Sequence, residues 1–399
     1  HYIILLLTII VNKFMQNTNK IKVTLSVIIV IILLVVASVY LTSNKKTTGI
    51  IKIGGISALT GVGSGIGEEE SRGARLAVEE INAKGGIHGS TLELISEDLS
   101  IDKIKNGTTV VQKLINVDKV VAIVGPQWDE PAFPILPLTE AAKVVVIGPD
   151  SSPMLKAETD YKYLFSTWYD NQVGVRELLR YAEKKGLTRI TIVKPTASGF
   201  WEYTASIFKR EAPNFGVTVI DEIDIGNPIT LDFKTGIMKA KEKNLDAIFV
   251  VTSDYNQCTF IKQAEQIGYN GITLGTEASG DPVSIEQCPK LMEKRLFSTP
   301  TQTENGKAFA ERFKARFGSY PRFPSAATAY DAVLTIARGL EKSNLKGGEA
   351  LRDAIAETKN LKGAGLDSIS FNKIGFINTP ENTFEMQTVK NGEFVKVNY

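Results

Sequence analysis

The stretch KIGGISALTGVGSGIGEEESRGARLAVEEINAKGGIHGSTLELISED (Lys52–Asp98) combines the signals of a strand, a helix and a second strand. Apolar residues from Ala74 to Ile81 recur at i, i+3, i+4 and i+7, which predicts a helix with one apolar stripe over Glu68–Asn82. Three glutamates, Glu68–Glu70, occupy the expected first turn, where the helix dipole favours negative charge, and the Gly-Gly pair that follows the helix ends it. The stretch therefore predicts a βαβ unit.

The same alternation of strand-length runs and helical periods continues along the chain. The runs are nearly continuous in valine and isoleucine, as in parallel strands that are covered on both faces. The pattern breaks near Phe165–Asn171, before a new helix over Gln172–Lys185, so the strands fall into two series and predict an α/β protein with two similar lobes. The predicted strands are Ile50–Leu59, Thr91–Glu97, Val120–Gly125 and Val144–Gly148, then Arg189–Lys194, Val217–Ile223, Ala247–Ser253 and Ile272–Gly275.

Composition argues against several classes of function. Lys and Arg number 46 against 44 Asp and Glu, whereas nucleic-acid binders usually carry a strong basic excess. The two histidines, His1 and His88, leave almost no material for histidine-based catalysis or a histidine-rich metal site. We therefore expect no catalytic residues, no metal, no cofactor and no nucleic-acid partner.

The N-terminal region carries an export signal. Residues 23–41 (VTLSVIIVIILLVVASVYL) form an uncharged run, preceded by lysines, that is long enough to cross a bilayer as a helix. The run is either an uncleaved signal anchor or a cleavable signal peptide. Residues 1–22 are then a cytoplasmic or non-native stretch with Met15 as the expected start, and residues 42–49 are a linker to an extracytoplasmic part.

A series of motifs follows in a fixed order. The motifs are GARLAVEEINAKGGIHG (Gly73–Gly89), VVAIVGP (Val120–Pro126), VVVIGPDSSP (Val144–Pro153), YKYLFST (Tyr161–Thr167), LGTEASGDP (Leu274–Pro282) and TAYDAVLTIARGLE (Thr328–Glu341). Together they resemble the branched-chain amino-acid (Leu/Ile/Val) binding proteins, which are type I periplasmic solute-binding proteins of ABC transporters. The resemblance covers the chain from Ile50 onward.

This resemblance implies two Rossmann-like lobes with parallel central sheets, joined by a three-strand hinge. Lobe 1 would hold residues 50–167 and 300–372, and lobe 2 would hold residues 168–299 and 373–399. The protein would capture an amino acid or amino-acid-like compound by hinge closure outside the cytoplasm and deliver it to an ABC transporter permease. The alternative is a membrane-tethered ligand sensor of the same fold.

Ligands of open parallel α/β sheets lie beyond the carboxyl ends of the strands, which here carry GPQWDEP, GPDSSP, the segment from Pro195, TSDYN and GTEAS. The resemblance implies that Ser151 or Ser152 bonds the carboxylate or ammonium of the amino acid and that Glu277 pairs with the ammonium. It also places Phe200 at a ligand-contacting aromatic position, with Trp201 beside it. The alternatives are a polar turn for the serines, a solvated loop acid for Glu277, and a place in the core for one of the two aromatics.

The segment after VAIVGP departs from the family pattern, in which a Ser-rich turn holds the carboxylate of the ligand. This chain has QWDE (Gln127–Glu130), and two acids would repel a carboxylate. Either the turn presents backbone N–H groups or Trp128 to the ligand, or the ligand is not a plain α-amino acid. A cationic or amide ligand would suit an acid such as Asp129.

Further departures concern the type of amino acid. Ile66 and Ser253 replace aromatic residues that are common in the leucine-type relatives, and Asp254 is adjacent to Ser253. Leucine itself is therefore not the expected ligand. Cys258 and Cys288 fall in the same predicted lobe, where they form either a disulfide, which an oxidising compartment permits, or two buried thiols.

Two enzyme-like features carry less weight. The acids Asp129, Glu130 and Glu277 could act as acid and base, but neither GxSxG nor a P-loop motif occurs. The glycine-rich GVGSGIG (Gly61–Gly67) lies between a strand and a helix, as a dinucleotide loop would. Three glutamates follow it at once, where an anionic pyrophosphate would have to lie, and this disfavours a nucleotide.

Overall fold

The computed structural model describes residues 49–149, 153–156, 160–196, 199–226, 232–252, 256–280 and 282–399, together with residue 8 and residues 29–34. Ser151, Ser152, Ser253 and Asp254 lie outside these ranges, as does most of the predicted helix over 23–41. Residues 29–34 are helical and largely exposed, and among the described helices none is long and apolar enough to cross a membrane. The membrane anchor stays a prediction.

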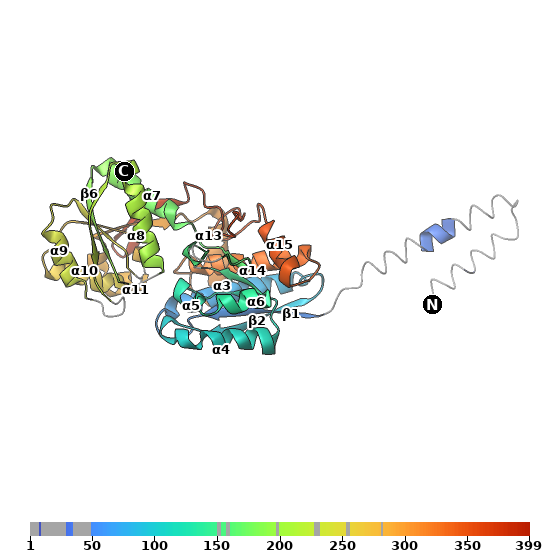
Figure 1. Ribbon diagram of the computed structural model, residues 1–399. Helices are drawn as coiled ribbons and strands as arrows, with labels where there is room; N and C mark the ends of the chain where they lie inside the picture. Colours follow the sequence, from blue (N-terminus) through green and yellow to red (C-terminus); the bar gives the residue numbers. More distant parts are fainter. Residues whose placement is uncertain are drawn as a thin grey trace. The chain divides into compact units, whose positions relative to one another are not determined.

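The first sheet is five-stranded and parallel, in the order β2-β1-β3-β4-β5. Figure 1 labels its strands β1 and β2. Its strands are β1 (Ile50–Ser57), β2 (Thr91–Asp98), β3 (Ala122–Val124), β4 (Val145–Gly148) and β5 (Leu164–Ser166). Because all of them run parallel, their carboxyl ends lie at one edge of the sheet. The sequence predicted four of these strands and missed β5, which is only three residues long.

The helices that pack around this sheet come from two distant parts of the chain. They are α3 (Ser64–Ala83), α4 (Gly107–Gln112), α5 (Asp129–Ala132) and α6 (Leu136–Ala142), then α13 (Glu304–Phe317), α14 (Ser325–Lys342) and α15 (Gly348–Ala356), with the short turns η1 (Ile101–Asn106), η2 (Lys113–Asp118) and η3 (Pro153–Lys156). Helices α3 and α14 approach closely at Gly73, where a Cβ atom would overlap the backbone oxygen of Ala326. This contact requires glycine.

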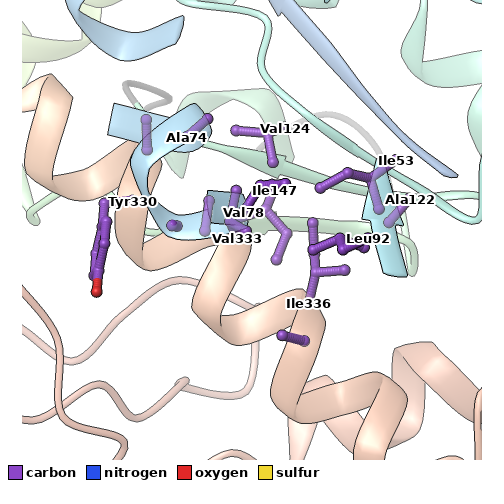
Figure 2. Close-up of a cluster of buried hydrophobic side chains, with 14 of the residues drawn as sticks. Ile53, Ala74, Val78, Leu92, Ala122, Val124, Ile147, Tyr330, Val333 and Ile336 are labelled. Carbon is purple, nitrogen blue, oxygen red and sulfur yellow. The ribbon is translucent and has the colours of Figure 1, made fainter. Parts of the chain in front are cut away.

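Side chains of the strands alternate between the two faces of the first sheet, and both faces are buried. In β3, Ala122 and Val124 belong to one apolar cluster and Ile123 to another. Figure 2 shows the first cluster, in which Val333 and Ile336 of α14 lie among the strand residues. Burial on both faces explains why the strand sequences are nearly continuous in apolar residues.

Helix α3 begins at Ser64, earlier than the predicted Glu68. The preceding Gly63 has a left-handed backbone (φ 85°), which lets the loop turn into the helix at this point. The prediction that Glu68–Glu70 occupy the first turn is therefore wrong. Glu69 instead is buried and accepts hydrogen bonds from the backbone N–H of Arg322 (2.6 Å) and from its guanidinium Nε (3.0 Å).

The second sheet is seven-stranded, in the order β12-β11-β10-β9-β8-β6-β7. Its strands are β6 (Arg189–Lys194), β7 (Thr218–Asp224), β8 (Ala247–Val250), β9 (Ile272–Gly275), β10 (Arg295–Pro300), β11 (Phe384–Lys390) and β12 (Glu393–Lys396). Strands β6 to β10 are parallel, whereas β11 is antiparallel to both of its neighbours. The prediction of a parallel central sheet holds for β6 to β10, and β11 and β12 add an antiparallel edge that the sequence analysis did not foresee. Asn391 and Gly392 both have positive φ and form the tight turn between β11 and β12.

Both faces of the second sheet are covered as well. Its helices are α7 (Asn171–Lys185), α8 (Phe200–Glu211), α9 (Lys234–Lys241), α10 (Gln257–Gln266), α11 (Pro282–Gln287) and α12 (Pro289–Met292), with the turns η4 (Ala212–Phe215) and η6 (Glu277–Gly280). Phe249 of β8 packs in the cluster that includes residues of α7 and α8, and Ile248 packs in the cluster on the opposite face. In that second cluster Cys258 and Cys288 are joined in a disulfide, with their Cα atoms 6.0 Å apart.

The chain passes between the two sheets three times, from β5 to α7, from β10 to α13, and from the segment after α15 to β11. The three passages are hydrogen-bonded to one another. The backbone N–H of Asp170 donates to Oγ1 of Thr379 (2.8 Å), and the backbone N–H of Thr301 donates to the backbone oxygen of Thr383 (2.7 Å). These bonds connect the first and second passages to the third.

Candidate functional site

A cavity of about 370 Å³ is lined by residues that follow strands of both sheets. Trp128 and Glu130 come after β3, Trp168 after β5, and Glu277 two residues after the end of β9. The charged side chains in the described lining are Glu130, Glu277 and Arg322, and aromatic rings form much of the remainder. The position agrees with the rule that ligands of parallel α/β sheets bind at the carboxyl ends of the strands.

The turn after β3 is fixed against the loop that precedes α3. Gln127 is buried, and its side-chain amide accepts a hydrogen bond from the backbone N–H of Ala58 (3.3 Å) and donates one to the backbone oxygen of Gly63 (3.3 Å). A Cβ atom at Gly63 would overlap the indole of Trp128. Glycine at this position therefore allows the Trp128 ring to lie where it lines the cavity.

Glu130 reaches the cavity from the first turn of α5. Its carboxylate lies close to Gly199, where an added Cβ would overlap Oε1 of Glu130. Within the described residues, this buried Oε1 atom has no hydrogen-bond partner. Burial, together with the negative charge of Asp129, raises the pKa of Glu130 to about 7. The cavity thus contains a carboxyl group whose charge depends on what binds beside it.

Glu277 enters the cavity from the second sheet, at the first residue of η6. Nδ2 of Asn171 donates a hydrogen bond to its Oε1 atom (3.1 Å). Burial raises the pKa of Glu277 to about 7, although the Asn171 bond acts in the opposite direction. This carboxyl group is therefore oriented by a fixed neighbour.

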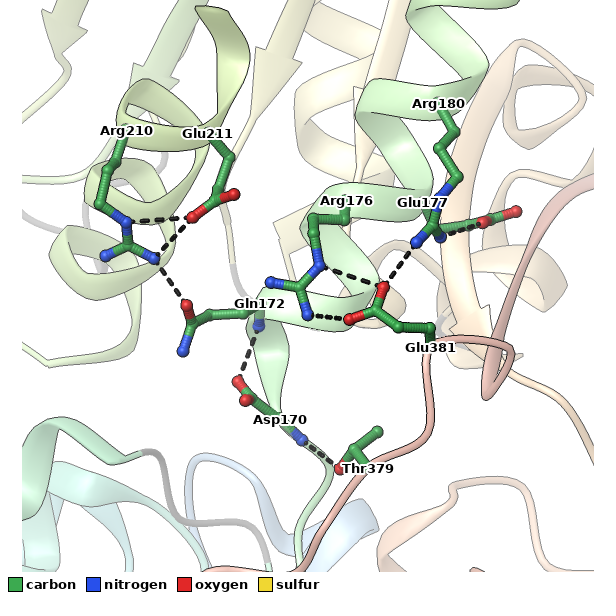
Figure 3. A network of polar contacts seen from close by, with 9 residues as sticks. All are labelled: Asp170, Gln172, Arg176, Glu177, Arg180, Arg210, Glu211, Thr379 and Glu381. Atoms are coloured by element: carbon green, nitrogen blue, oxygen red, sulfur yellow. Dashed lines mark hydrogen bonds and ion pairs between the residues drawn. The ribbon is translucent and has the colours of Figure 1, made fainter. Parts of the chain in front are cut away.

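Asn171 is held in place by the start of α7. The preceding residue, Asp170, caps the helix with its side chain and bonds Thr379 through its backbone N–H. Figure 3 shows that the next two turns of α7 are tied to the same passage of the chain by ion pairs with Glu381. This network fixes the N-terminus of α7 and so places Asn171 beside Glu277.

Aromatic rings line the same cavity as the two carboxyl groups. Trp168 and Tyr169 are edge to face, with ring centroids 5.4 Å apart, and the Tyr169 hydroxyl donates to the backbone oxygen of Gly365 (3.1 Å). Trp201 and Phe200 begin α8 on another part of the lining. Such rings cover apolar surface of a ligand, and their faces also attract cations.

The cavity brings together five of the residues that the sequence selected, namely Ile66, Trp128, Phe200, Trp201 and Glu277. Asp129 is buried but does not line the cavity in the described structure. Their roles in binding remain predictions.

Sequence reasoning did not select Asn171, although it lies with the cavity-lining Trp168 in the FSTWYDN break between the two strand series. That break was the available signal, since it marks where the chain leaves the first sheet. Glu130 appeared in the sequence only as a candidate acid or base. Arg322 and Ser325 carry no local signal, because they reach the cavity from the loop before α14 and from the start of that helix.

Comparison with known proteins places this architecture in a family. A family model described as periplasmic binding protein matches residues 50–393. The leucine-, isoleucine-, valine-, threonine- and alanine-binding protein of Pseudomonas aeruginosa is 27% identical over 313 residues, which are 77% of this chain and 81% of that protein.

Solved structures share the fold. The branched-chain amino acid transporter substrate binding protein LivJ of Streptococcus pneumoniae, in complex with isoleucine, has a TM-score of 0.75 at 24% identity, covering 86% of this chain and 97% of that one. A periplasmic binding protein type 1 from Bordetella pertussis has a TM-score of 0.77 at 20% identity, covering 87% of this chain and 100% of that one. The fold is therefore that of type I periplasmic binding proteins, and because the family model spans most of the chain, this protein belongs to the periplasmic binding protein family.

Proposed function

We propose that this protein captures an amino acid or amino-acid-like compound in the cavity and delivers it to the permease of an ABC importer. The observation that carries the proposal is the position of Glu277, a carboxyl group at a strand end, inside the cavity and oriented by Asn171. The relative from Pseudomonas aeruginosa is named for the amino acids it binds, and the structure from Streptococcus pneumoniae contains isoleucine.

Glu277 would accept hydrogen bonds from the ammonium group of the ligand. A charge-assisted bond of this kind is stronger than a neutral one, and stronger still in a cavity from which the ligand excludes water. Ser151 and Ser152, outside the described residues, would bond the carboxylate, as the family resemblance implies. The aromatic rings would cover the side chain of the ligand.

Transport would follow from hinge closure. The lining includes residues of both sheets, so a ligand that contacts both stabilises the arrangement in which they are close together. The protein acts outside the cytoplasm, where a disulfide such as that between Cys258 and Cys288 persists. We further propose that it performs no reaction, since its relatives are binding proteins.

Tryptophan emission and melting temperature test the proposal directly. The chain has three tryptophans, and Trp128, Trp168 and Trp201 all line the cavity. We expect saturable changes in emission and a raised melting temperature with at least one α-amino acid. The matched carboxylic acid that lacks the amino group, such as 4-methylpentanoate for leucine, should give neither change. A protein that melts cooperatively but responds to no amino acid contradicts the proposal.

A further inference from the structure

The two carboxyl groups of the cavity have different neighbours. Glu277 is bonded by Asn171, whereas Glu130 lies beside Asp129 and against Gly199. Glu277 alone satisfies the need of an amino-acid ligand for one anionic partner. Glu130 is therefore an additional acid, with surroundings of its own, that recognition of a single amino group does not explain.

A buried carboxylate without a donor is costly, because folding removes its hydrogen bonds to water and supplies none in return. In the described structure Oε1 of Glu130 is in this position. Burial and the charge of Asp129 both favour its neutral form in the empty cavity. A positively charged N–H group of a ligand would reverse that preference, since it provides both the missing donor and the opposite charge.

The remainder of the lining also suits a cation. Arg322 is the basic side chain of the described lining, and it is engaged by the buried Glu69 through an ion pair of 3.0 Å. The ring of Trp128 comes from the same turn as Glu130, and indole faces attract ammonium and guanidinium groups. The charge of the cavity is therefore negative when its acids are ionised.

We propose that the ligand is a dibasic amino acid, with its α-amino group bound by Glu277 and a second cationic nitrogen bound by Glu130 beside Trp128. The inference rests on the proposed amino-acid function and adds the class of side chain. A terminal ammonium or guanidinium group would donate to the Oε1 atom that has no donor within the described residues. The alkyl part of the ligand would pack on the aromatic rings that line the cavity.

Calorimetric titration of the full chain with L-lysine, L-ornithine, L-arginine and L-norleucine tests this at about pH 8, where both glutamates ionise readily. Norleucine is the matched probe because it has the lysine chain without the terminal amino group. We expect at least one dibasic amino acid to bind more than about tenfold tighter than norleucine. Glu130→Gln should reduce that preference to about threefold or less, because the dibasic amino acid loses its charged partner and norleucine does not.

The control variant is Glu357→Gln, the same change at an exposed position, which should preserve the preference. Norleucine binding as tightly as the dibasic amino acids overturns the inference but supports the amino-acid function. This comparison needs only the wild-type protein and so does not depend on the folding of a variant. If Glu130→Gln loses the same affinity for norleucine as for the dibasic amino acid, the inference is also overturned, because Glu130 would then act on the structure of the cavity. If no amino acid binds in the titration, both the amino-acid function and the dibasic ligand are overturned.

Discussion

Glu277 and Glu130 face one cavity from different sheets, and they reach it in different ways. Glu277 lies two residues after β9 and has Asn171 as a donor at 3.1 Å, and Asn171 is itself fixed by the capped start of α7. Glu130 lies one short turn after β3, close to the backbone of Gly199, and its Oε1 atom has no donor in the part of the chain described. Before a ligand arrives, the Oε1 atom of Glu277 has a donor, and the Oε1 atom of Glu130 has none among the described residues.

The different surroundings of Glu277 and Glu130 suggest different contributions to binding, one to affinity and the other to selectivity. A group that is already oriented loses little freedom on binding, so its contact with a ligand contributes most of its strength to affinity. A buried group without a partner penalises every ligand that fails to supply one, and this discriminates among ligands. We therefore expect changes at Glu277 to weaken all amino-acid ligands and changes at Glu130 to alter the choice among them.

Removing the charge of Glu277 should give the largest effect. Glu277→Gln keeps the shape of the side chain but leaves the ligand ammonium without a charged partner. We expect a loss of about 2–3 kcal/mol in binding, roughly 30- to 150-fold in Kd, for every amino acid that binds. Calorimetric titration measures it, with the exposed Glu286→Gln as the control. An unchanged Kd would mean that Glu277 does not contact the ammonium.

A smaller effect should follow from disturbing the Glu130 side of the cavity. In Gly63→Ala the added methyl group would overlap the Trp128 ring, and the left-handed backbone (φ 85°) would be strained. We expect a loss of about 1–2 kcal/mol in stability, with shifted tryptophan emission and weaker ligand binding. Thermal melts and fluorescence titration measure these changes.

Gly318→Ala is the matched control for this experiment. Gly318 has nearly the same φ (86°), but an added Cβ meets nothing within 4 Å. It should reproduce the backbone strain and leave emission and affinity unchanged. If both variants bind and fluoresce alike, the position of Trp128 does not depend on Gly63.

The sequence was sufficient to predict the layered α/β architecture and part of the candidate site. Strand-length apolar runs identified β6 and β9 with their exact ends, and a strand-breaking residue bounds each run on one side, Pro195 after β6 and Gly271 before β9. Strand-end position selected Trp128 and Glu277 for the same reason. The antiparallel edge was missed, although the Asn391–Gly392 pair signals a hairpin.

Other features depend on contacts between distant segments, which local patterns do not contain. Asn171 becomes part of the site only because the start of α7 lies within hydrogen-bond distance of Glu277, and nothing in the neighbours of Asn171 in the sequence predicts that bond. The close approach of Gly73 to Ala326 joins residues far apart in the chain. Whether Glu130 finds a donor likewise depends on side chains from other elements, so an acidic turn in the sequence could not distinguish a solvated carboxylate from a buried one.

The smallest expected effect concerns pH and tests whether the two carboxyl groups are alike in the empty cavity. The pKa of both Glu130 and Glu277 is raised to about 7 from 4.5. Between these values the folded protein keeps protons that the unfolded chain has released, so the free energy of unfolding falls as the pH rises through this window and levels off above it. The pKa of the buried Asp331 is also raised to about 7 and contributes in the same direction.

Melting temperature should therefore fall by a few degrees from about pH 5 to about pH 7.5 without ligand, and less steeply in Glu130→Gln and in Glu277→Gln. Since Asp331 is unchanged in both variants, a slope equal to that of the wild type would show that the substituted carboxyl group ionises normally, and a difference between the variants would rank the two groups by burial.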